Sequence, residues 1–356
     1  MKKIFLLSAI TMFAFGFSQQ NVSITNLQPK TEISVFPLVS ITNNKKAEEK
    51  INTFLQVSHL ENIPNSKKNP FVYTESEKLI YGEPMHFYEW KKLNTPKNIL
   101  SLSILGESID GTPIKFNLYK NFDARTGNLI NNTDLFQENS VSTVEKLIES
   151  KIKKKIDDFL KEITAKKNPD KNTKLQIEIY ETCITDNILM YLDYYFENQS
   201  ITFIAPRCAD NLPNLDILGT FYISFSNKEL EPYFSEYAKN LLSNNENAIP
   251  TKNLNYKLYK GKIEGKNPIT LLFSTINEDG SFSATYWTDD EKKLNTWDGN
   301  FTGNHISIIE KDSFDDKTRK WITKSTIEMD LTQNKMSGTW QDFKTKKYLK
   351  IELEEL

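Results

Sequence analysis

The chain has 356 residues, of which 38% are hydrophobic, 12% aromatic and 26% charged, and its formal net charge at pH 7 is −2. This length and composition predict a packed core and leave room for two domains. The 45 basic residues nearly balance the 47 acidic ones, which argues against a nucleic-acid partner because such a partner requires a strongly basic surface.

Residues 1–18 have the pattern of a secretory signal peptide. Lys2 and Lys3 precede an apolar run from Ile4 to Phe17, and small residues offer a cleavage site before Gln19. The run is too short for a membrane span, and no other stretch approaches the ~20 apolar residues that a span needs. We therefore expect an exported, periplasmic or extracellular protein with no membrane span in the mature chain.

The chain has two cysteines, Cys183 and Cys208. In an oxidising compartment, two cysteines most simply form one disulfide, and the chain-entropy model gives a loop of this length roughly 3 kcal/mol of stabilisation. Two buried free thiols are the alternative. Because no histidine lies near either cysteine, the pair cannot fill a zinc shell, and we expect no metal and no other cofactor.

The first part of the chain alternates between strand and helix patterns. A loose polar leader is expected at 19–30. The predicted elements after it are a strand at 31–42 that Pro37 places at an edge, a helix at 43–60, strands at 78–90 and 98–107, and a hairpin turn at Asp110-Gly111 leading to a strand that starts at Ile114.

The most informative stretch is 119–136, which reads YKNFDARTGNLINNTDLF. It follows a strand with period-two alternation that runs to Leu118. Asp123 can cap backbone donors in a turn, and Gly127 can adopt a positive φ without a Cβ clash. A second turn at 131–134 precedes two apolar anchors. The stretch predicts a strand, two tight turns and a helix, which is an architectural signature rather than a catalytic one.

A long amphipathic helix is predicted at 142–166, with Ser142 and Glu145 as an S-x-x-E capping box. The segment at 175–183 is compatible with helix or strand. The remaining predicted elements of this region are a strand pair at 188–195 and 201–206 with its turn at 198–200, a strand at 218–225 and an amphipathic helix at 229–242.

The Asn-rich segment 243–254 contains Pro250 and has no periodicity, which predicts an interdomain linker. From 255 to 356 the chain predicts eight short strands separated by turns, typical of a meander, sandwich or small barrel. The fold class expected is therefore an α+β N-terminal domain at 31–242, with an antiparallel sheet and packed helices, followed by an all-β C-terminal domain at 255–356. Glycines recur with similar neighbours at Gly261, Gly299 and Gly338, which suggests repeated hairpins.

A family resemblance rests on seven residues of the 119–136 stretch: Phe122, Asp123, Thr126, Gly127, Asp134, Leu135 and Phe136. Their spacing resembles the signature of a secreted α+β family that includes the ectodomain of RsiV-like anti-sigma factors and the N-terminal region of PdaC-like peptidoglycan deacetylases. The resemblance extends over roughly 31–242. Relatives often carry a small-residue and histidine run before the signature strand, where this chain has only Gly111-Thr112-Pro113.

The resemblance implies an extracytoplasmic sensing or binding domain. Some relatives bind lysozyme-type muramidases, and others sit beside cell-wall enzymes. Residues beyond Asn255 are similar to small β-domains in exported proteins of Bacteroidetes-type bacteria. No region resembles the deacetylase catalytic domain.

Motifs that would carry catalysis are not found. His59, His86 and His305 have no close metal-ligand spacing, and a solvent-facing or core position is expected for each. The sequence has no G-x-S-x-G elbow and no P-loop. Asp123 and Asp134 could form a carboxylate pair for acid–base chemistry, but turn capping explains both. No catalytic residue is assigned, and the binding residues are unknown at this stage.

Three clusters admit a binding role beside a structural one. The acidic Asp289, Asp290 and Glu291 are typical of a solvated hairpin loop, with calcium as the alternative. The basic run Lys151, Lys153, Lys154 and Lys155 is typical of a solvated helix face, with an anionic glycan or acidic protein as the alternative. The aromatic residues of the last domain pack a core or, alternatively, line a ligand site: Tyr286, Trp287, Trp297, Trp321 and Trp340.

The sequence therefore favours an exported, non-enzymatic binding or sensing protein of the cell envelope. Its expected partner is an envelope protein or glycan, with a lysozyme-like muramidase or peptidoglycan implied by the family resemblance. Two alternatives stay open: an accessory protein of a cell-wall hydrolase, and a carrier that holds a small apolar ligand inside the β-domain.

Overall fold

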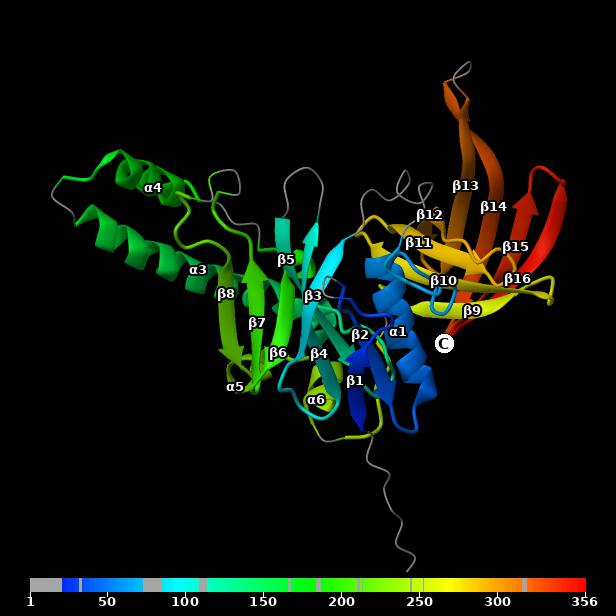
Figure 1. Cartoon of the computed structure of the whole chain (residues 1–356), viewed down its shortest axis with the longest axis horizontal. Helices are drawn as coiled ribbons and strands as arrows, with labels where there is room; N and C mark the ends of the chain where they lie inside the picture. Colours follow the sequence, from blue (N-terminus) through cyan, green and yellow to red (C-terminus); the bar gives the residue numbers. More distant parts are fainter. Residues whose placement is uncertain are drawn as a thin grey trace, which may run out of the picture.

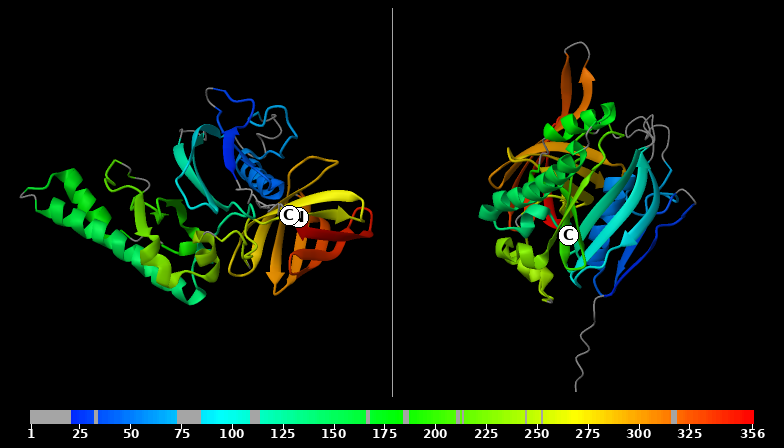
Figure 2. Two further views of the ribbon diagram at one scale, coloured as in Figure 1. Left: turned by 90° about the horizontal axis from the view of Figure 1, so that it is seen from below. Right: turned by 90° about the vertical axis from the view of Figure 1, so that its left-hand side faces the viewer.

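The structure is a computed structural model that describes residues 21–31, 34–72, 85–108, 114–165, 168–183, 187–209, 212, 214–243, 245–251, 253–315 and 319–356, without the side chains of 312–315 and 320. Two three-stranded sheets stand between a helical arm at one end and a closed barrel at the other (Figures 1 and 2). The predicted fold class, α+β followed by all-β, is confirmed. The expected signal peptide and the Asp110-Gly111 turn lie outside the described residues.

The N-terminal strand β1 (Val22–Asn26) pairs antiparallel with β2 (Pro37–Ile41). The expectation of a loose leader at 19–30 is therefore wrong for these residues. Val22 and Ile24 alternate with polar neighbours and pack against the core, which is the pattern of a half-buried strand. The predicted strand at 31–42 is shorter than expected, because β2 begins at Pro37, where a strand tolerates a missing N–H.

Helix α1 (Lys45–Leu60) begins after Asn44, whose side chain accepts a hydrogen bond from the Ala47 N–H at 3.1 Å. Its apolar stripe shares a core with the antiparallel sheet β3 (His86–Lys92), β4 (Ile99–Ser108) and β5 (Ile114–Asp123). The fully buried Ile51 and Leu55 of α1 belong to the same cluster as Leu102 of β4.

The turn after β5 is fixed by Asp123 and Gly127. The Asp123 carboxylate accepts hydrogen bonds from the Arg125 backbone N–H (3.0 Å), Nε (2.9 Å) and Nη2 (2.7 Å). Gly127 has a φ of 76°, and a Cβ at this position would lie 2.5 Å from the Ala47 carbonyl oxygen. The signature turn therefore packs directly on the first turn of α1, and only glycine fits there.

The helical arm consists of α3 (Val141–Thr164) and α4 (Lys171–Glu181), which settles the ambiguous segment as helix. The predicted capping box is wrong: the N-cap is Ser140, and no side chain caps the helix there. Glu145 instead accepts a hydrogen bond from the Leu189 N–H at 2.8 Å. This contact draws the short helix η3 (Leu189–Tyr191) onto α3.

Helix α3 covers the sheet β6 (Asp193–Glu197), β7 (Ser200–Ala205) and β8 (Phe221–Ser226). The helix predicted at 229–242 is broken into α5 (Asn227–Leu230), η4 (Glu231–Tyr233) and α6 (Glu236–Leu242). Pro232 lacks an N–H and disfavours helical backbone before it, and Ser235 caps a new helix by accepting from Ala238 at 3.1 Å. The one-turn helices η1 (Asn132–Leu135) and η2 (Glu138–Ser140) lead into α3.

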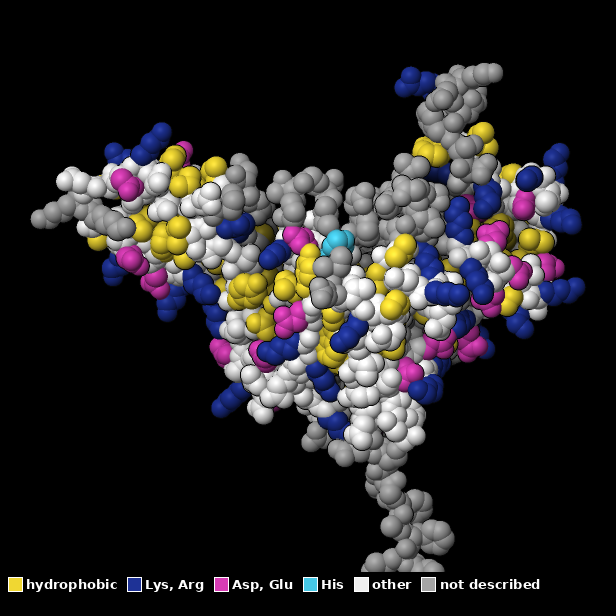
Figure 3. All heavy atoms as spheres, viewed as in Figure 1, with side chains coloured by type: hydrophobic (Ala, Val, Ile, Leu, Met, Phe, Trp, Pro, Cys, Tyr) yellow, Lys and Arg dark blue, Asp and Glu magenta, His cyan; other side chains and the backbone are white. Residues whose placement is uncertain are grey.

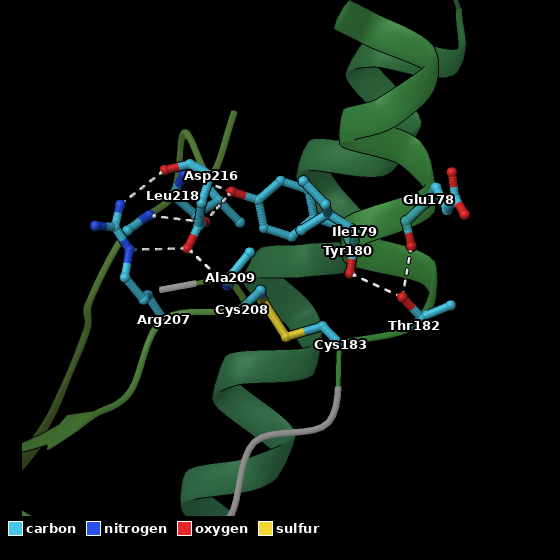
Figure 4. The surroundings of a disulfide bond; sticks show 11 residues. Glu178, Ile179, Tyr180, Thr182, Cys183, Arg207, Cys208, Ala209, Asp216 and Leu218 are labelled. Carbon is cyan, nitrogen blue, oxygen red and sulfur yellow. Dashed lines mark hydrogen bonds and ion pairs between the residues drawn. A yellow bond between two sulfur atoms is a disulfide. The ribbon is translucent and has the colours of Figure 1, made fainter. Parts of the chain in front are cut away.

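The predicted disulfide is confirmed: Cys183 and Cys208 are bonded, with their Cα atoms 5.2 Å apart (Figure 4). Beside it, the Asp216 carboxylate accepts hydrogen bonds from the Tyr180 hydroxyl at 2.6 Å and from Arg207 Nε at 3.0 Å. The bond and this carboxylate together hold the end of α4 against the segment between β7 and β8.

The last part of the chain closes into an eight-stranded antiparallel barrel, in which β16 pairs with β9. The strands are β9 (Leu258–Ile263), β10 (Asn267–Ile276), β11 (Ser281–Thr288), β12 (Asn295–Thr302), β13 (His305–Asp315), β14 (Lys320–Thr332), β15 (Lys335–Asp342) and β16 (Lys347–Glu355). β13 and β14 extend beyond the barrel as a projecting hairpin (Figure 2). Gly261, Gly299 and Gly338 lie within β9, β12 and β15, in a barrel whose successive strands pair as antiparallel hairpins, so the expected repetition of hairpins is confirmed.

The barrel also shares the core of the N-terminal sheet. Alternation along β9, β10 and β11 turns Leu258, Leu272 and Trp287 outward, and all three are buried in the cluster that contains α1. The opposite faces of these strands point into the barrel. No helix in the described part of the chain is long and apolar enough to cross a membrane. The boundary at 243–254 stays a prediction.

Candidate functional site

The seven signature residues lie at the junction of the two α+β cores. Phe122 is fully buried in the core of α1, whereas Leu135 and Phe136 are buried in the core under α3. Thr126 and Gly127 form the turn between them. Asp123 is held by Arg125, and Asp134 accepts from the Asn131 side chain at 3.3 Å. Each carboxylate thus has a partner in its own turn.

A cleft of about 870 Å³ opens on the side of this junction where the sheet loops meet α6. Half of its lining residues have polar but uncharged side chains. The lining comprises Asn94, Thr95, Pro96, Asn198, Gln199, Asn227, Lys228, Glu231, Phe234, Lys239, Leu242 and Ser243. We refer to it as the amide cleft. Its volume falls within the range of small-molecule sites.

Backbone hydrogen bonds join the three loops that form the amide cleft. Asn198 and Gln199 have φ values of 51° and 61°, which give the two-residue turn between β6 and β7 the backbone of a type I′ hairpin. The Asn198 N–H donates to the Asn94 carbonyl at 2.9 Å, and the Asn227 N–H donates to the Gln199 carbonyl at 2.9 Å. The Asn94 amide also donates to Asn198 Oδ1 at 2.8 Å.

Asn227 is the one cleft residue with a buried side-chain acceptor that has no hydrogen-bond partner among the described residues, namely its Oδ1. The capping box of α5 uses its neighbours instead: Ser226 accepts from the Glu229 N–H at 3.2 Å, and Glu229 accepts from the Ser226 N–H at 2.7 Å. A buried acceptor without a partner costs free energy, which a donor from a ligand would recover.

The charges in the amide cleft nearly cancel. Lys239 is paired with Glu236 at 2.9 Å, which leaves Lys228 of α5 and Glu231 of η4 as opposite charges on adjoining short helices. The half-buried Leu242 adds an apolar surface, whereas Phe234 is buried in the core behind the cleft. Among the described residues, no group of histidine, cysteine, aspartate and glutamate side chains is arranged to hold a metal ion. The cleft offers hydrogen bonds of both polarities and no nucleophile paired with a base.

Two of the four lysines in the basic run on α3 form hydrogen bonds with the backbone of β8. Lys151 Nζ donates to the Ser224 carbonyl at 2.8 Å, and Lys155 Nζ donates to the Tyr222 carbonyl at 3.0 Å. These carbonyls lie on the side of β8 away from β7, so the lysines cover a free strand edge. On the face in Figure 3, basic and acidic side chains are interspersed over the barrel rather than gathered in one patch.

The aromatic residues of the barrel are mostly core. Trp297 and Tyr286 are buried and stacked with ring centroids 4.2 Å apart, and Trp340 meets Trp297 edge-on at 5.4 Å. Trp321 is 55% exposed on the projecting hairpin. Asp289, Asp290 and Glu291 are exposed in the loop between β11 and β12, as a solvated hairpin predicts.

The three histidines are not brought together. His86 is half-buried on β3, and His305 is exposed on β13 between Asp330 (2.8 Å) and Glu328 (2.9 Å). These two carboxylates, Asp330 first, raise the pKa of His305. His59 lies at the end of α1 in a separate pocket.

The amide cleft was not predicted from the sequence. Its residues carry a local signal, because each contributing loop has the Asn, Ser or Pro chemistry of a turn. The turn at 198–200 was predicted on that basis. What the sequence did not show is that turns more than 100 positions apart, at Asn94 and Asn198, meet at one place.

Comparisons with known proteins identify no family. No protein-family model matches the chain, and no curated protein matches it. Among solved structures, the chain is similar to the crystal structure of a member of the DUF3298 family from Bacteroides fragilis, with 15% sequence identity and a TM-score of 0.36. The match covers 61% of this chain and 92% of that chain. A likeness of this size gives neither a name nor a function.

Proposed function

We propose that the protein is an exported, non-enzymatic binding protein of the cell envelope, and that the amide cleft binds an uncharged ligand rich in hydroxyl and amide groups. The ligand class that fits is the N-acetylated glycan of peptidoglycan. The observation that carries this proposal is the buried, unpartnered Oδ1 of Asn227 in a cleft lined by further amides.

The chemistry of the lining supports this ligand class. An asparagine or glutamine amide can donate two hydrogen bonds and accept others, so it matches hydroxyl and acetamido groups in either direction. A charged ligand would meet the opposed charges of Lys228 and Glu231, and Lys239, which is already paired with Glu236. Leu242 is half-buried and offers an apolar contact for the less polar face of a sugar ring.

The two alternative functions receive less support. A hydrolase needs a paired nucleophile and base or a metal, and the described residues of the amide cleft offer neither. An apolar carrier needs a hollow barrel, whereas the barrel interior is filled by large side chains such as Tyr259, Phe273 and Trp297. Export, the RsiV-like and PdaC-like relationship and a lysozyme-like partner stay predictions from the sequence.

Co-sedimentation with insoluble peptidoglycan tests the proposal. The mature chain from Gln19 is incubated with purified sacculi, and the bound fraction is measured with and without soluble chitotetraose as competitor. We expect binding that the competitor reduces. Asn227→Ala is expected to weaken binding roughly fivefold to tenfold, the value of one hydrogen bond.

Asn300→Ala is the matched control, because Asn300 is an exposed amide on β12 outside the amide cleft. It should bind like the unchanged protein. Equal binding by both variants would remove the cleft from the proposal, and no binding by the unchanged protein would remove the ligand class. The same assay with immobilised lysozyme tests the muramidase partner separately.

A further inference from the structure

A second, smaller pocket lies on the other side of the signature turn. It has a volume of about 230 Å³, room for about eight water molecules at ~30 Å³ each. The end of α1, the middle of β5, the loop at 129–132, the start of β6 and Tyr256 at the barrel all contribute to its wall. It shares no residue with the amide cleft.

Lys120 occupies the core side of β5. It pairs across the sheet with Leu102, which is fully buried, and alternation places it on the same face as Leu118 and Phe122. A lysine at a position where the pattern calls for an apolar residue is costly, since its ammonium loses hydration. This burial lowers the pKa of Lys120.

The Lys120 ammonium takes part in none of the ion pairs or hydrogen bonds found between described residues. The carboxylate of Asp193 contributes to the same pocket wall and favours the charged form of Lys120 from a distance, but the Asp193 side chain is exposed to water. A half-buried cation on the core side of a strand is thus left without a direct partner among the described residues, whereas charges that lose hydration are normally paired.

His59 faces the same pocket from the last turn of α1. Its ring packs edge-on against Phe54 with centroids 5.9 Å apart, and its Nε2 is buried with no hydrogen-bond partner among the described residues. Burial, and then the charge of Lys120, lower its pKa to about 3, so the imidazole is neutral at physiological pH. A neutral imidazole nitrogen can donate or accept, depending on the tautomer.

Several other polar groups of the wall are already engaged. The Tyr194 hydroxyl donates to the Ile130 carbonyl at 2.7 Å, and the Asn132 amide donates to the Leu192 carbonyl at 2.8 Å. The wall also has apolar members, which include Leu129 and Met190. An ammonium and a neutral imidazole nitrogen, neither with a hydrogen-bond partner among the described residues, therefore belong to residues that line one pocket of mixed polar and apolar walls.

We propose that this pocket binds a small carboxylate with a short apolar body, whose charged oxygens meet Lys120 Nζ and His59 Nε2. The site would be independent of glycan binding in the amide cleft. A free short-chain acid and the carboxylate of an amino acid share this chemistry, and they differ in the ammonium group, which would face Asp193.

Imidazole resonances of the unchanged protein give a test that needs no variant. Butyrate and L-leucine are titrated separately into ¹³C-histidine-labelled protein, with butanol as the uncharged probe. We expect saturable shifts of the His59 signals with a Kd of about 1 mM or tighter, while the signals of His305 stay in place. Saturation by butyrate alone identifies a simple acid, and tighter binding of leucine identifies an amino acid.

Lys120→Met keeps the length of the side chain and removes the charge, so the variant should fold and should lose at least ~tenfold in affinity for the carboxylate that binds. Lys115→Met is the matched control, because Lys115 is exposed on the opposite face of the same strand. Unmoved His59 signals with both carboxylates, or equal binding by Lys120→Met, would overturn the proposal.

Discussion

Lys50 of α1 donates a hydrogen bond at 3.2 Å to the carboxylate of Glu355, which lies 305 positions further along the chain in β16. The second carboxylate oxygen accepts from Lys257 Nζ at 3.1 Å, and Asn128 of the signature turn donates to the first at 3.2 Å. Lys50 and Lys257 are both buried. One carboxylate thus ties helix, signature turn and barrel together.

Glu355→Gln should destabilise the protein by about 3–5 kcal/mol, since it leaves two buried ammonium groups without their shared counter-charge. Urea unfolding at pH 7 measures the free energy of unfolding. Glu354→Gln is the control, because Glu354 is exposed and its carboxylate lies 3.6 Å from the exposed Lys335. That change should stay within about 0.5 kcal/mol. Equal losses of unfolding free energy in the two variants would contradict the role of Glu355 in holding α1, the signature turn and the barrel together.

The same carboxylate predicts a loss of stability in acid. Burial alone would raise the pKa of Glu355, but Lys257 and Lys50 outweigh burial, and the pKa lies below its ordinary value. The contribution is therefore complete above the unfolded pKa of about 4.3 and is lost as the pH falls through the folded value. Unfolding curves from pH 7 to pH 3 should show a smaller loss for Glu355→Gln than for the unchanged protein. Equal losses of stability in the two proteins as the pH falls would contradict the assignment of this acid sensitivity to Glu355.

Asp134 predicts the opposite pH dependence. Burial, as the largest cause, raises its pKa from 3.8 to about 6. The neutral form is therefore favoured in the folded protein, and stability is lost as the pH rises from the unfolded to the folded value. Asp134→Asn should stabilise the protein at pH 8 by about 3 kcal/mol and change little at pH 3, given 1.36 kcal/mol per pKa unit. Thermal unfolding at both pH values tests this, and exposed Asp289→Asn is the control.

The disulfide should stabilise the helical arm. A Cys183→Ser/Cys208→Ser variant is expected to lose about 3.5 kcal/mol, the chain-entropy value for a loop of 25 residues. Chemical denaturation measures the loss, and reducing the unchanged protein should give a matching shift. Identical unfolding curves with and without reductant would show that the disulfide does not stabilise the protein by restricting the conformations of the unfolded chain.

Gly338 lies at a position of the barrel that has no room for a side chain. A Cβ at this position would lie 1.9 Å from the Glu328 carbonyl oxygen of β14, so Gly338→Ala must push two paired strands apart. We expect a loss of about 3 kcal/mol in the free energy of unfolding. Ser337→Ala, at the exposed neighbouring position, should be nearly neutral. A stable Gly338→Ala barrel would show that the strands can separate locally at no cost.

The sequence predicted elements wherever a local rule governed them. Period-two alternation and turn residues gave the barrel strands, and the short spacing of apolar residues gave α1 and α3. The predictions were wrong where a contact with a residue distant in the sequence determines the local structure. Glu145 was assigned to a capping box but bonds Leu189, and β1 was assigned to a loose leader but pairs with β2.

The candidate sites escaped prediction for the same reason. Asn94, Asn198 and Asn227 each have an ordinary turn context, and only the paired loops bring their amides together. Lys120 did leave a trace, because it breaks the apolar alternation of β5. The break in alternation does not show that His59 is the neighbour of Lys120 in the pocket. His59 lies on a helix, 61 positions earlier in the chain.

Isothermal titration of the mature chain with chitotetraose tests the central claim most directly, because it measures affinity and stoichiometry without an insoluble phase. The account predicts one saturable site per chain with a Kd of about 1 mM or tighter, weakened by Asn227→Ala and unchanged by Asn300→Ala. Absence of saturable binding, or binding that Asn227→Ala leaves unchanged, would contradict the assignment of the amide cleft as a glycan site.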